Sequence, residues 1–194
     1  MCGIVGYYSK THSDRLSALL PLATDALAHR GPDGRGIFFD KAAGVGLGHR
    51  RLSILDLSAA GAQPMTALNG LLQVVYNGEI YNFREIRAEL IALGHEFTSG
   101  SDTEVILKGY VEWGKAVVHR LAGMFAMAIW DGRSRELTLI RDRIGIKPLY
   151  YYINGETLLF ASELKGLMVF PVIPRHVERS SIPKLLHYQY IPGP

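Results

Sequence analysis

The sequence predicts an α+β fold with at least two antiparallel sheets. Three observations support this prediction: apolar stretches with a period of two, helical stretches that open with capping signals, and hairpin turns between consecutive strands. Hairpins impose antiparallel pairing, which argues against a doubly wound parallel sheet. Helices are then expected to cover the outer faces of the sheets.

The first predicted elements are a strand and a helix. Residues 3–8, "GIVGYY", read as a short buried strand. From Ser13, the predicted N-cap, apolar residues recur every three or four positions, as in an amphipathic helix. Pro21 lies inside this pattern and is expected to kink or split the helix. Further strands are predicted at 36–39, 45–50 and 71–76.

Two helices with clear start signals follow. The segments "NFRE" at 82–85 and "SDTE" at 101–104 each place a capping residue three positions before a glutamate. Gly94 and Gly114 are predicted to end these helices, because glycine favours the backbone conformation that follows a last helical turn.

Two hairpins and a short helix come next. The turns are predicted at Asp131-Gly132 and Asn154-Gly155, and the second is the strongest short hairpin signal. A short helix is predicted at 162–168. The paired strands are 124–130 with 137–140, and 148–153 with 157–161.

Composition bounds the class of protein. The chain is 48% hydrophobic and 20% charged, which suits a folded core. Its net charge of +3 comes from scattered basic residues, so we expect no nucleic-acid partner. A single cysteine excludes an internal disulfide and a cysteine-rich zinc site, and no metal site is predicted. We find no secretory signal or membrane-spanning run, and expect a cytoplasmic protein.

The composition changes near residue 170. Residues 170–194 contain five prolines, which indicates a linker followed by the start of another unit. We therefore expect the chain to continue beyond Pro194.

The single cysteine, Cys2, directly follows Met1. Once Met1 is removed, the α-amine of Cys2, with a reference pKa of about 7.7–8.0, can take the thiol proton. Such a nucleophile needs no separate histidine. The alternative is that Cys2 is a small apolar side chain at the start of a strand.

Other polar positions could complete a catalytic site. Asn77 and Gly78, expected where a strand ends, could donate an amide NH₂ and a backbone N–H to an oxyanion; an ordinary Asn-Gly turn is the alternative. Arg51 could bind a carboxylate or be a solvated surface residue. Asp102 could bind a cation or favour the start of its helix. The segment "HRGPDGRG" at 29–36 could simply end a helix in a tight turn.

Together these segments resemble the class II glutamine amidotransferase (glutaminase) domain of asparagine synthetase-type enzymes. The resemblance covers about residues 1–168. It rests on "MCGIVG", "HRGPDG", "GHRRLSILDL", "QPM", "YNGEIYNF", "SGSDTEVIL", "GMFAMAIWD", "RDRIGIKPLYY" and "FASELKGL".

The resemblance implies a fold and a domain division. The fold is that of N-terminal nucleophile hydrolases, an αββα sandwich of two antiparallel sheets. Residues 1–168 would form the amidotransferase domain. Residues 169–194 would be a linker and the beginning of an ATP-dependent synthetase domain, whose ATP-binding SGGxDS loop does not occur in this sequence.

The resemblance also implies the site and its chemistry. Cys2 would attack the side-chain amide of L-glutamine, form a γ-glutamyl thioester and release ammonia to the synthetase domain. ATP and Mg²⁺ are expected only in that domain, and no cofactor is expected in this one. The implied roles are oxyanion donors for Asn77 and Gly78, α-carboxylate binding for Arg51, backbone contacts for Leu52 and Leu55, and α-ammonium binding for Glu79 and Asp102.

Several alternatives remain open at this point. The acceptor of the ammonia is aspartate or a carboxylate on a peptide, sugar or specialised metabolite. The domain could instead serve phosphoribosyl or hexosamine chemistry, or be a catalytically silent regulatory module of the same fold. A homodimer is a further possibility.

Overall fold

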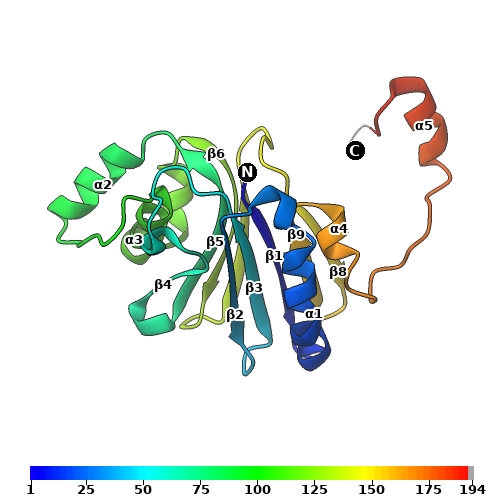
Figure 1. The fold of residues 1–194 in the computed structure, drawn as a ribbon, viewed down its shortest axis with the longest axis horizontal. Helices are drawn as coiled ribbons and strands as arrows, with labels where there is room; N and C mark the ends of the chain where they lie inside the picture. The colour runs from blue at the N-terminus through cyan, green and yellow to red at the C-terminus, as the bar shows by residue number, and fades with distance from the viewer. Residues whose placement is uncertain (192–194) are drawn as a thin grey trace.

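Two antiparallel sheets stacked face to face form the centre of the protein, and helices cover their outer faces (Figure 1). The computed structural model describes residues 1–191. The layers follow the order helix, sheet, sheet, helix. This arrangement confirms the predicted α+β class and the αββα sandwich.

The first sheet has five strands in the order β2-β3-β1-β9-β8. In its centre, β1 pairs with β3 from Gly3 opposite Arg50, and with β9 from Val5 opposite Ala161. The start of β1 therefore lies beside the end of β3. The strands are β1 (Gly3–Ser9), β2 (Gly34–Asp40), β3 (Val45–Arg51), β8 (Tyr150–Asn154) and β9 (Thr157–Ala161).

The second sheet has four strands in the order β4-β5-β6-β7. The short β4, which the sequence did not predict, pairs only with residues 72–74 of β5. The rest of β5 is therefore an open sheet edge. The strands are β4 (Met65–Ala67), β5 (Leu72–Ile80), β6 (Gly123–Asp131) and β7 (Glu136–Arg141).

Helices cover each sheet on one side. The first sheet carries α1 (Ser13–Asp25) and α4 (Leu164–Leu167), and the second carries α2 (Phe83–Ala92) and α3 (Asp102–Trp113). Short 3₁₀ helices connect these elements: η1 (Ala28–Arg30), η2 (Ala59–Gly61), η3 (Leu68–Gly70) and η4 (Gly114–His119).

Alternation along the strands creates three apolar layers. In β1, Ile4 faces the other sheet, whereas Val5 faces α1. In β5, Val75 faces the first sheet, whereas Val74 and Tyr76 face the helices. Because neighbouring residues of a strand point to opposite faces, each sheet is apolar on both sides.

The start of α1 differs from the prediction. His12, not Ser13, occupies the N-cap position, and the Ser9 hydroxyl accepts its N–H at 3.1 Å. Pro21 was expected to kink or split this helix; it does not split it, because α1 is one helix from Ser13 to Asp25. Apolar residues on both sides of Pro21 pack on the first sheet and hold the helix together.

The capping signals correctly locate the starts of α2 and α3, but only one of the two capping side chains bonds its own helix. Asn82 is the N-cap of α2, yet its side chain bonds Arg120 and Ala122 across the fold. Ser101 caps α3 by accepting the N–H of Thr103, as predicted. Gly94 and Gly114 follow the helices with positive φ, which confirms both as stop signals.

The hairpin between β8 and β9 is confirmed, although its turn is shifted by one residue. Asn154 pairs with Thr157, so the two loop residues are Gly155 and Glu156. The strand β5 runs to Ile80, so Asn77 and Gly78 lie inside it rather than at its end. The alternative of an Asn77-Gly78 turn is therefore wrong.

One helix of the C-terminal segment was not predicted. The helix α5 (Ser181–Tyr188) buries no residue and stands away from the sandwich at the end of an extended segment (Figure 1). Within residues 1–191, no helix has the length and apolar character that crossing a membrane requires.

Candidate active site

A cleft lies where the start of β1, the end of β3 and the open edge of β5 meet. It encloses about 540 Å³ of empty space, its open mouth included. All eight positions that the sequence singled out line this one cleft: Cys2, Arg51, Leu52, Leu55, Asn77, Gly78, Glu79 and Asp102. The cysteine therefore lies beside the positions expected to bind the substrate.

The thiol of Cys2 contacts the backbone of Leu52. The Leu52 N–H donates to Cys2 Sγ at 3.4 Å, and the Leu52 carbonyl lies 3.6 Å from the same sulfur. Burial raises the pKa of the thiol, and Leu52, the positive amino terminus and Arg51 offset this only in part. The thiol therefore needs a base to become a nucleophile.

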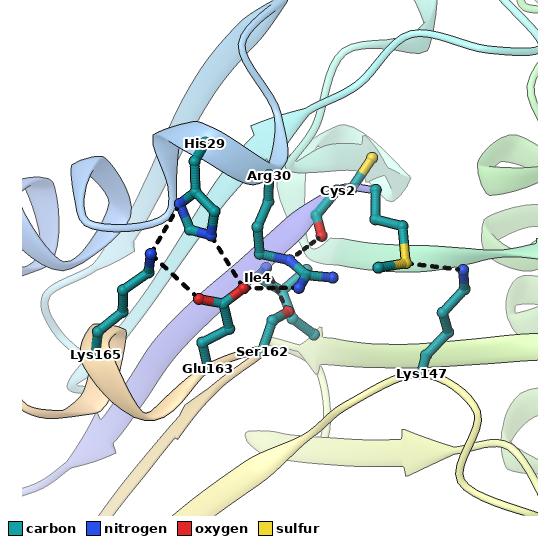
Figure 2. Close-up of polar contacts among 9 residues, drawn as sticks. Cys2, Ile4, His29, Arg30, Lys147, Ser162, Glu163 and Lys165 are labelled. Atoms are coloured by element: carbon teal, nitrogen blue, oxygen red, sulfur yellow. Dashed lines mark hydrogen bonds and ion pairs between the residues drawn. The ribbon is translucent and has the colours of Figure 1, made fainter.

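An ion-pair network fixes the backbone around Cys2 (Figure 2). Arg30 Nε donates to the Cys2 carbonyl at 2.9 Å, and Arg30 Nη1 donates to Glu163 at 2.8 Å. His29 and Lys165 contact the same carboxylate at 3.0 and 3.4 Å. Burial opposes ionisation of Glu163, but these three partners lower its pKa to about 2.

Ile4 and Ser162 pair through two hydrogen bonds, which hold the start of β1 on the side of α4. The Ile4 N–H donates to Ser162 Oγ at 3.0 Å, and the Ser162 N–H donates to the Ile4 carbonyl at 2.8 Å. Together with Arg30, Ser162 leaves the main chain at Cys2 little freedom to move.

The backbone at Gly78 points into the cleft. On the neighbouring β6, Phe125 turns its N–H and carbonyl towards Asp142, so it cannot also bond Gly78 opposite. The N–H groups of Tyr76 and Ile80 point the same way as that of Gly78, and they donate to Gln63 and Asp102 at 2.6 and 3.0 Å. The Gly78 N–H between them therefore faces the open edge of β5.

Asn77 supplies a second free donor. Its side chain is 1% exposed, and its Nδ2 has no hydrogen-bond partner among residues 1–191. Such unsatisfied buried donors are rare and call for an explanation. The glycine that follows is required by packing, because a Cβ at Gly78 would lie 2.4 Å from the Met124 carbonyl oxygen.

Arg51 supports the loop that follows β3. Its guanidinium donates to the carbonyl of Ser58 at 2.8 Å and to that of Asp56. The Asp56 carboxylate in turn accepts the N–H of Gly100 at 2.8 Å, which joins this loop to the start of α3. The cleft wall is thus tied on both sides, and Arg51 is not a free surface residue.

Two carboxylates face each other across the cleft. Tyr76 Oη donates to Asp102 at 2.7 Å, yet burial raises the pKa of Asp102 above its ordinary value. Burial and the charge of Asp102 also raise the pKa of Glu79, which Lys147 opposes. Two partly desolvated carboxylates in one cleft favour a bound cation.

Sequence reasoning missed several polar residues of the cleft, among them Gln63, Tyr76 and Lys147. Gln63 bridges β5 and α3, since it accepts from Tyr76 and donates to Thr103 at 3.1 Å. The Tyr76 hydroxyl holds Asp102, and Lys147 lines the opposite wall. The segments "QPM" and "RDRIGIKPLYY" contain Gln63 and Lys147, so their motifs were the available signal.

His49 lies beneath the cleft between the sheets and is fully buried. Its Nε2 lies 3.1 Å from the Tyr76 carbonyl, and burial lowers its pKa to about 4. A neutral ring that bonds a carbonyl through Nε2 carries its hydrogen there. Among residues 1–191, no group of three His, Cys, Asp or Glu side chains could hold a metal ion.

The fold and the position of Cys2 define a class of protein. Over 87% of the chain, the structure resembles glutamine phosphoribosylpyrophosphate amidotransferase from Bacillus subtilis with a TM-score of 0.69 at 21% identity, covering 43% of that chain. This likeness places the domain in the N-terminal nucleophile hydrolase fold.

The sequence comparisons identify the family. The glutamine amidotransferase domain family matches residues 1–194. Glutamine-hydrolysing asparagine synthetase 3 of Bacillus subtilis (strain 168) is 38% identical over 95% of this chain and 30% of its own length. Amidase chry2 of Gibberella zeae is 38% identical over 93% of this chain and 28% of its own length. The chain therefore belongs to the glutamine amidotransferase domain family, and it spans about 30% of the length of these curated relatives.

Proposed function

We propose that this domain hydrolyses L-glutamine to glutamate and ammonia, with Cys2 as the nucleophile. The observation that carries the proposal is the meeting of a thiol with two unclaimed hydrogen-bond donors, Asn77 Nδ2 and the Gly78 N–H, in one cleft. Attack of a thiolate on an amide creates an oxyanion, and two such donors can stabilise it.

The charged residues of the cleft match the ends of a free amino acid. Arg51 would bind the α-carboxylate through the guanidinium N–H groups that the carbonyls of Ser58 and Asp56 leave unused. Glu79 and Asp102 would bind the α-ammonium, whose positive charge favours the ionised form of two carboxylates that burial makes harder to ionise. The backbone of Leu52 and Leu55 would line the side of the same pocket.

Removal of Met1 would supply the base. The freed α-amine of Cys2 takes the proton of its own thiol, directly or through a water molecule, and the sulfur attacks the amide carbon. The π electrons of the carbonyl move to its oxygen, and Asn77 and Gly78 donate hydrogen bonds to the oxyanion that results. The ammonium formed on Cys2 then gives its proton to the amide nitrogen, the C–N bond breaks, and ammonia leaves.

A γ-glutamyl thioester on Cys2 remains after ammonia departs. Water then attacks this thioester, with the α-amine again as the base, and the C–S bond breaks to give glutamate and the thiol. The two half-reactions together return the thiol and the amine to their starting state, so the cycle consumes only glutamine and water.

The ammonia would serve an ATP-dependent synthetase domain in the same longer chain. The name of asparagine synthetase 3 supports asparagine synthesis, and a related amidation is the alternative. ATP and Mg²⁺ belong to that second domain in this proposal. The single cysteine, a free thiol, fits a reducing compartment, so we place the reaction in the cytoplasm.

Glutamate release from the protein without Met1 tests the proposal. We expect the wild type to release glutamate and Cys2→Ala to release none, and intact mass should show that the active chain begins at Cys2. Cys2→Ala must keep the wild-type unfolding temperature for the comparison to count. Equal release by both proteins would rule out Cys2 as the nucleophile, and no release by the trimmed wild type would favour a silent module.

A further inference from the structure

The loop between β7 and β8 is rigid because of one carboxylate. Asp142 accepts the N–H groups of Phe125, Ile146 and Lys147 at 3.1, 2.8 and 2.9 Å. Burial opposes ionisation of Asp142, but these backbone bonds keep its pKa below the ordinary value. Arg141 also donates to the Lys147 carbonyl at 2.7 Å. Residues 142–147 are therefore held in a single conformation.

This loop carries the Lys147 ammonium into the cleft. Ile144 and Ile146 are 82% and 51% exposed, whereas Lys147 is 7% exposed and lines the cleft beside Cys2. Its Nζ lies 3.5 Å from Sδ of Met1, the residue bonded to Cys2 (Figure 2). Among residues 1–191, Lys147 forms no ion pair. Its hydrogen-bond partner is this thioether, and its charge lowers the pKa of Glu79 without forming an ion pair. A buried ammonium so weakly paired is costly, which points to a role in the site.

We propose that the Lys147 ammonium sets the protonation state of the Cys2 thiol and α-amine, and so fixes the pH range in which the nucleophile is reactive. Lys147 is a positioning residue in this view, since it acts through Cys2 and does not react. The inference rests on the proposed role of Cys2 in glutamine hydrolysis.

The physical basis is the charge of the thiol–amine pair. At low pH the pair is a thiol and an ammonium with a net charge of +1. The reactive pair has lost one proton to solvent and is neutral overall, whether that proton came from sulfur or nitrogen. A nearby cation disfavours the +1 state, so Lys147 promotes loss of this proton at lower pH. A unit charge that lines the same partly buried cleft shifts such a step by about one pH unit.

Other charged groups also act on this pair: the charge of Arg51 lowers the pKa of the thiol, and the charge of Asp102 raises it. The Arg51 guanidinium bonds the carbonyls of Asp56 and Ser58, and Arg30 bonds Glu163. Asp102 accepts the Tyr76 hydroxyl. The titratable and charged groups around Cys2 are Arg30 of η1, Arg51 of β3, Asp56 of the following loop, Tyr76 and Glu79 of β5, Asp102 of α3 and Lys147. Lys147 is the cation among them whose head group has no oxygen partner.

Alkylation of the thiol by iodoacetamide tests the inference without any substrate. Cys2 is the only cysteine of the chain, so the rate reports on this site alone. We expect Lys147→Met, on the chain without Met1, to move the midpoint of the rate–pH profile up by about one unit. Lys147→Arg keeps the charge and should stay near the wild-type midpoint. Lys41→Met removes an exposed lysine at the opposite end of the first sheet and should leave the midpoint unchanged.

In Lys147→Met, the acid limb of the pH profile of kcat/KM for glutamate release should also move to higher pH. Lys147→Gln provides a second neutral variant, and the unfolding temperature shows that each protein is folded. An unchanged midpoint in both neutral variants, or an equal shift in Lys41→Met, overturns the inference. Absence of glutamate release from a wild type that still shows the Lys147-dependent alkylation shift would overturn the proposed function and leave this inference standing.

Discussion

Asn77 has a buried amide nitrogen with no partner among residues 1–191, in a cleft that also holds the thiol. An unpaired buried donor costs about 1–3 kcal/mol, so it lowers stability in the absence of a ligand. Residues that break a local rule of stability are often functional. Asn77 lies next to the Gly78 N–H, which is also free. Oxyanion binding by these two donors would explain why the unsatisfied amide is kept.

Asn77→Ala should separate catalysis from stability. We expect kcat for glutamate release to fall by about 100-fold to 1,000-fold, with KM nearly unchanged, because the lost donor acts on the transition state. The unfolding temperature should stay the same or rise, since an unsatisfied donor is removed. Steady-state kinetics and thermal unfolding measure the two effects. A variant that keeps the wild-type kcat would exclude Asn77 from oxyanion binding.

The sequence was informative about some site residues and silent about others. Cys2 is notable as a lone thiol next to the first residue, and Asn77-Gly78 as a polar pair in an apolar stretch. Gln63 and Lys147 have no such local mark. Their roles depend on contacts with Thr103 and Met1, which are distant in the sequence, so the residues alone could not reveal them.

Arg30 links three elements at the base of the nucleophile. It joins η1 to the start of β1 through the Cys2 carbonyl, and to the residue before α4 through Glu163. Its side chain is 8% exposed, so its charge depends on the Glu163 carboxylate. This network aligns the main chain on which the thiol and the α-amine are carried.

Glu163→Gln should weaken both stability and activity. We expect a loss of about 1–3 kcal/mol in the free energy of unfolding, because Arg30 keeps a buried charge without its anion. Glutamate release should fall as the Cys2 backbone loosens. Urea unfolding and steady-state kinetics provide the measurements. The matched control is Glu156→Gln, which removes an exposed contact with Lys10 at 3.9 Å and should change neither quantity. If the two variants behave alike, the network does not support Cys2.

Local signals found the elements better than they found the partners of each element. Capping residues located α2 and α3 because they act within one helical turn. The Asn82 side chain, however, serves the loop before β6, and Glu104 binds Thr98 and Ser99 rather than its own N-cap. These choices are made by tertiary contacts, which a capping pattern does not contain.

The sandwich ends before α5. Phe170 is fully buried against α1 and the first sheet, whereas α5 buries no residue. A chain that ends at His176 should therefore keep the full unfolding temperature. A chain that ends at Val169 lacks Phe170 and should lose about 3–5 kcal/mol of stability. Thermal and urea unfolding measure both effects. We expect only the chain that ends at Val169 to be destabilised. The predicted boundary at residue 168 stays a prediction until this is done.

Stability should fall in mild acid because of His49. The unfolded chain binds a proton on this ring below pH 6.5, whereas burial holds the folded pKa at about 4. The folded state is therefore penalised as the pH falls from 6.5 to 4, by about 2 kcal/mol between pH 7 and pH 5. Asp102 and Glu79 act in the opposite sense, since their raised pKa values favour proton uptake by the folded state.

His49→Gln isolates this contribution. Glutamine keeps a donor for the Tyr76 carbonyl but does not titrate, so the variant should lose less stability than the wild type between pH 7 and pH 5. Urea unfolding at the two pH values gives the comparison. Equal losses in both proteins would show that His49 is not the group responsible.

The fold class could be predicted because periodicity and hairpins are local, but the stacking of the sheets could not. The short β4 has three residues and gives no periodic signal. The αββα order came only from the family resemblance. The pairing of β1 with β9, which joins residues over 150 positions apart such as Val5 and Ala161, was not predicted. The cleft forms where these distant strands meet, so its geometry also required the structure.

The central claim is that Cys2, freed of Met1, forms a covalent intermediate with glutamine. Acid-quenched intact mass analysis of the trimmed protein, taken during turnover, measures this directly. We predict a γ-glutamyl adduct on the N-terminal residue that hydroxylamine removes, and none in Cys2→Ala. Continued glutamate release by Cys2→Ala, or an adduct located elsewhere in the chain, would contradict the claim.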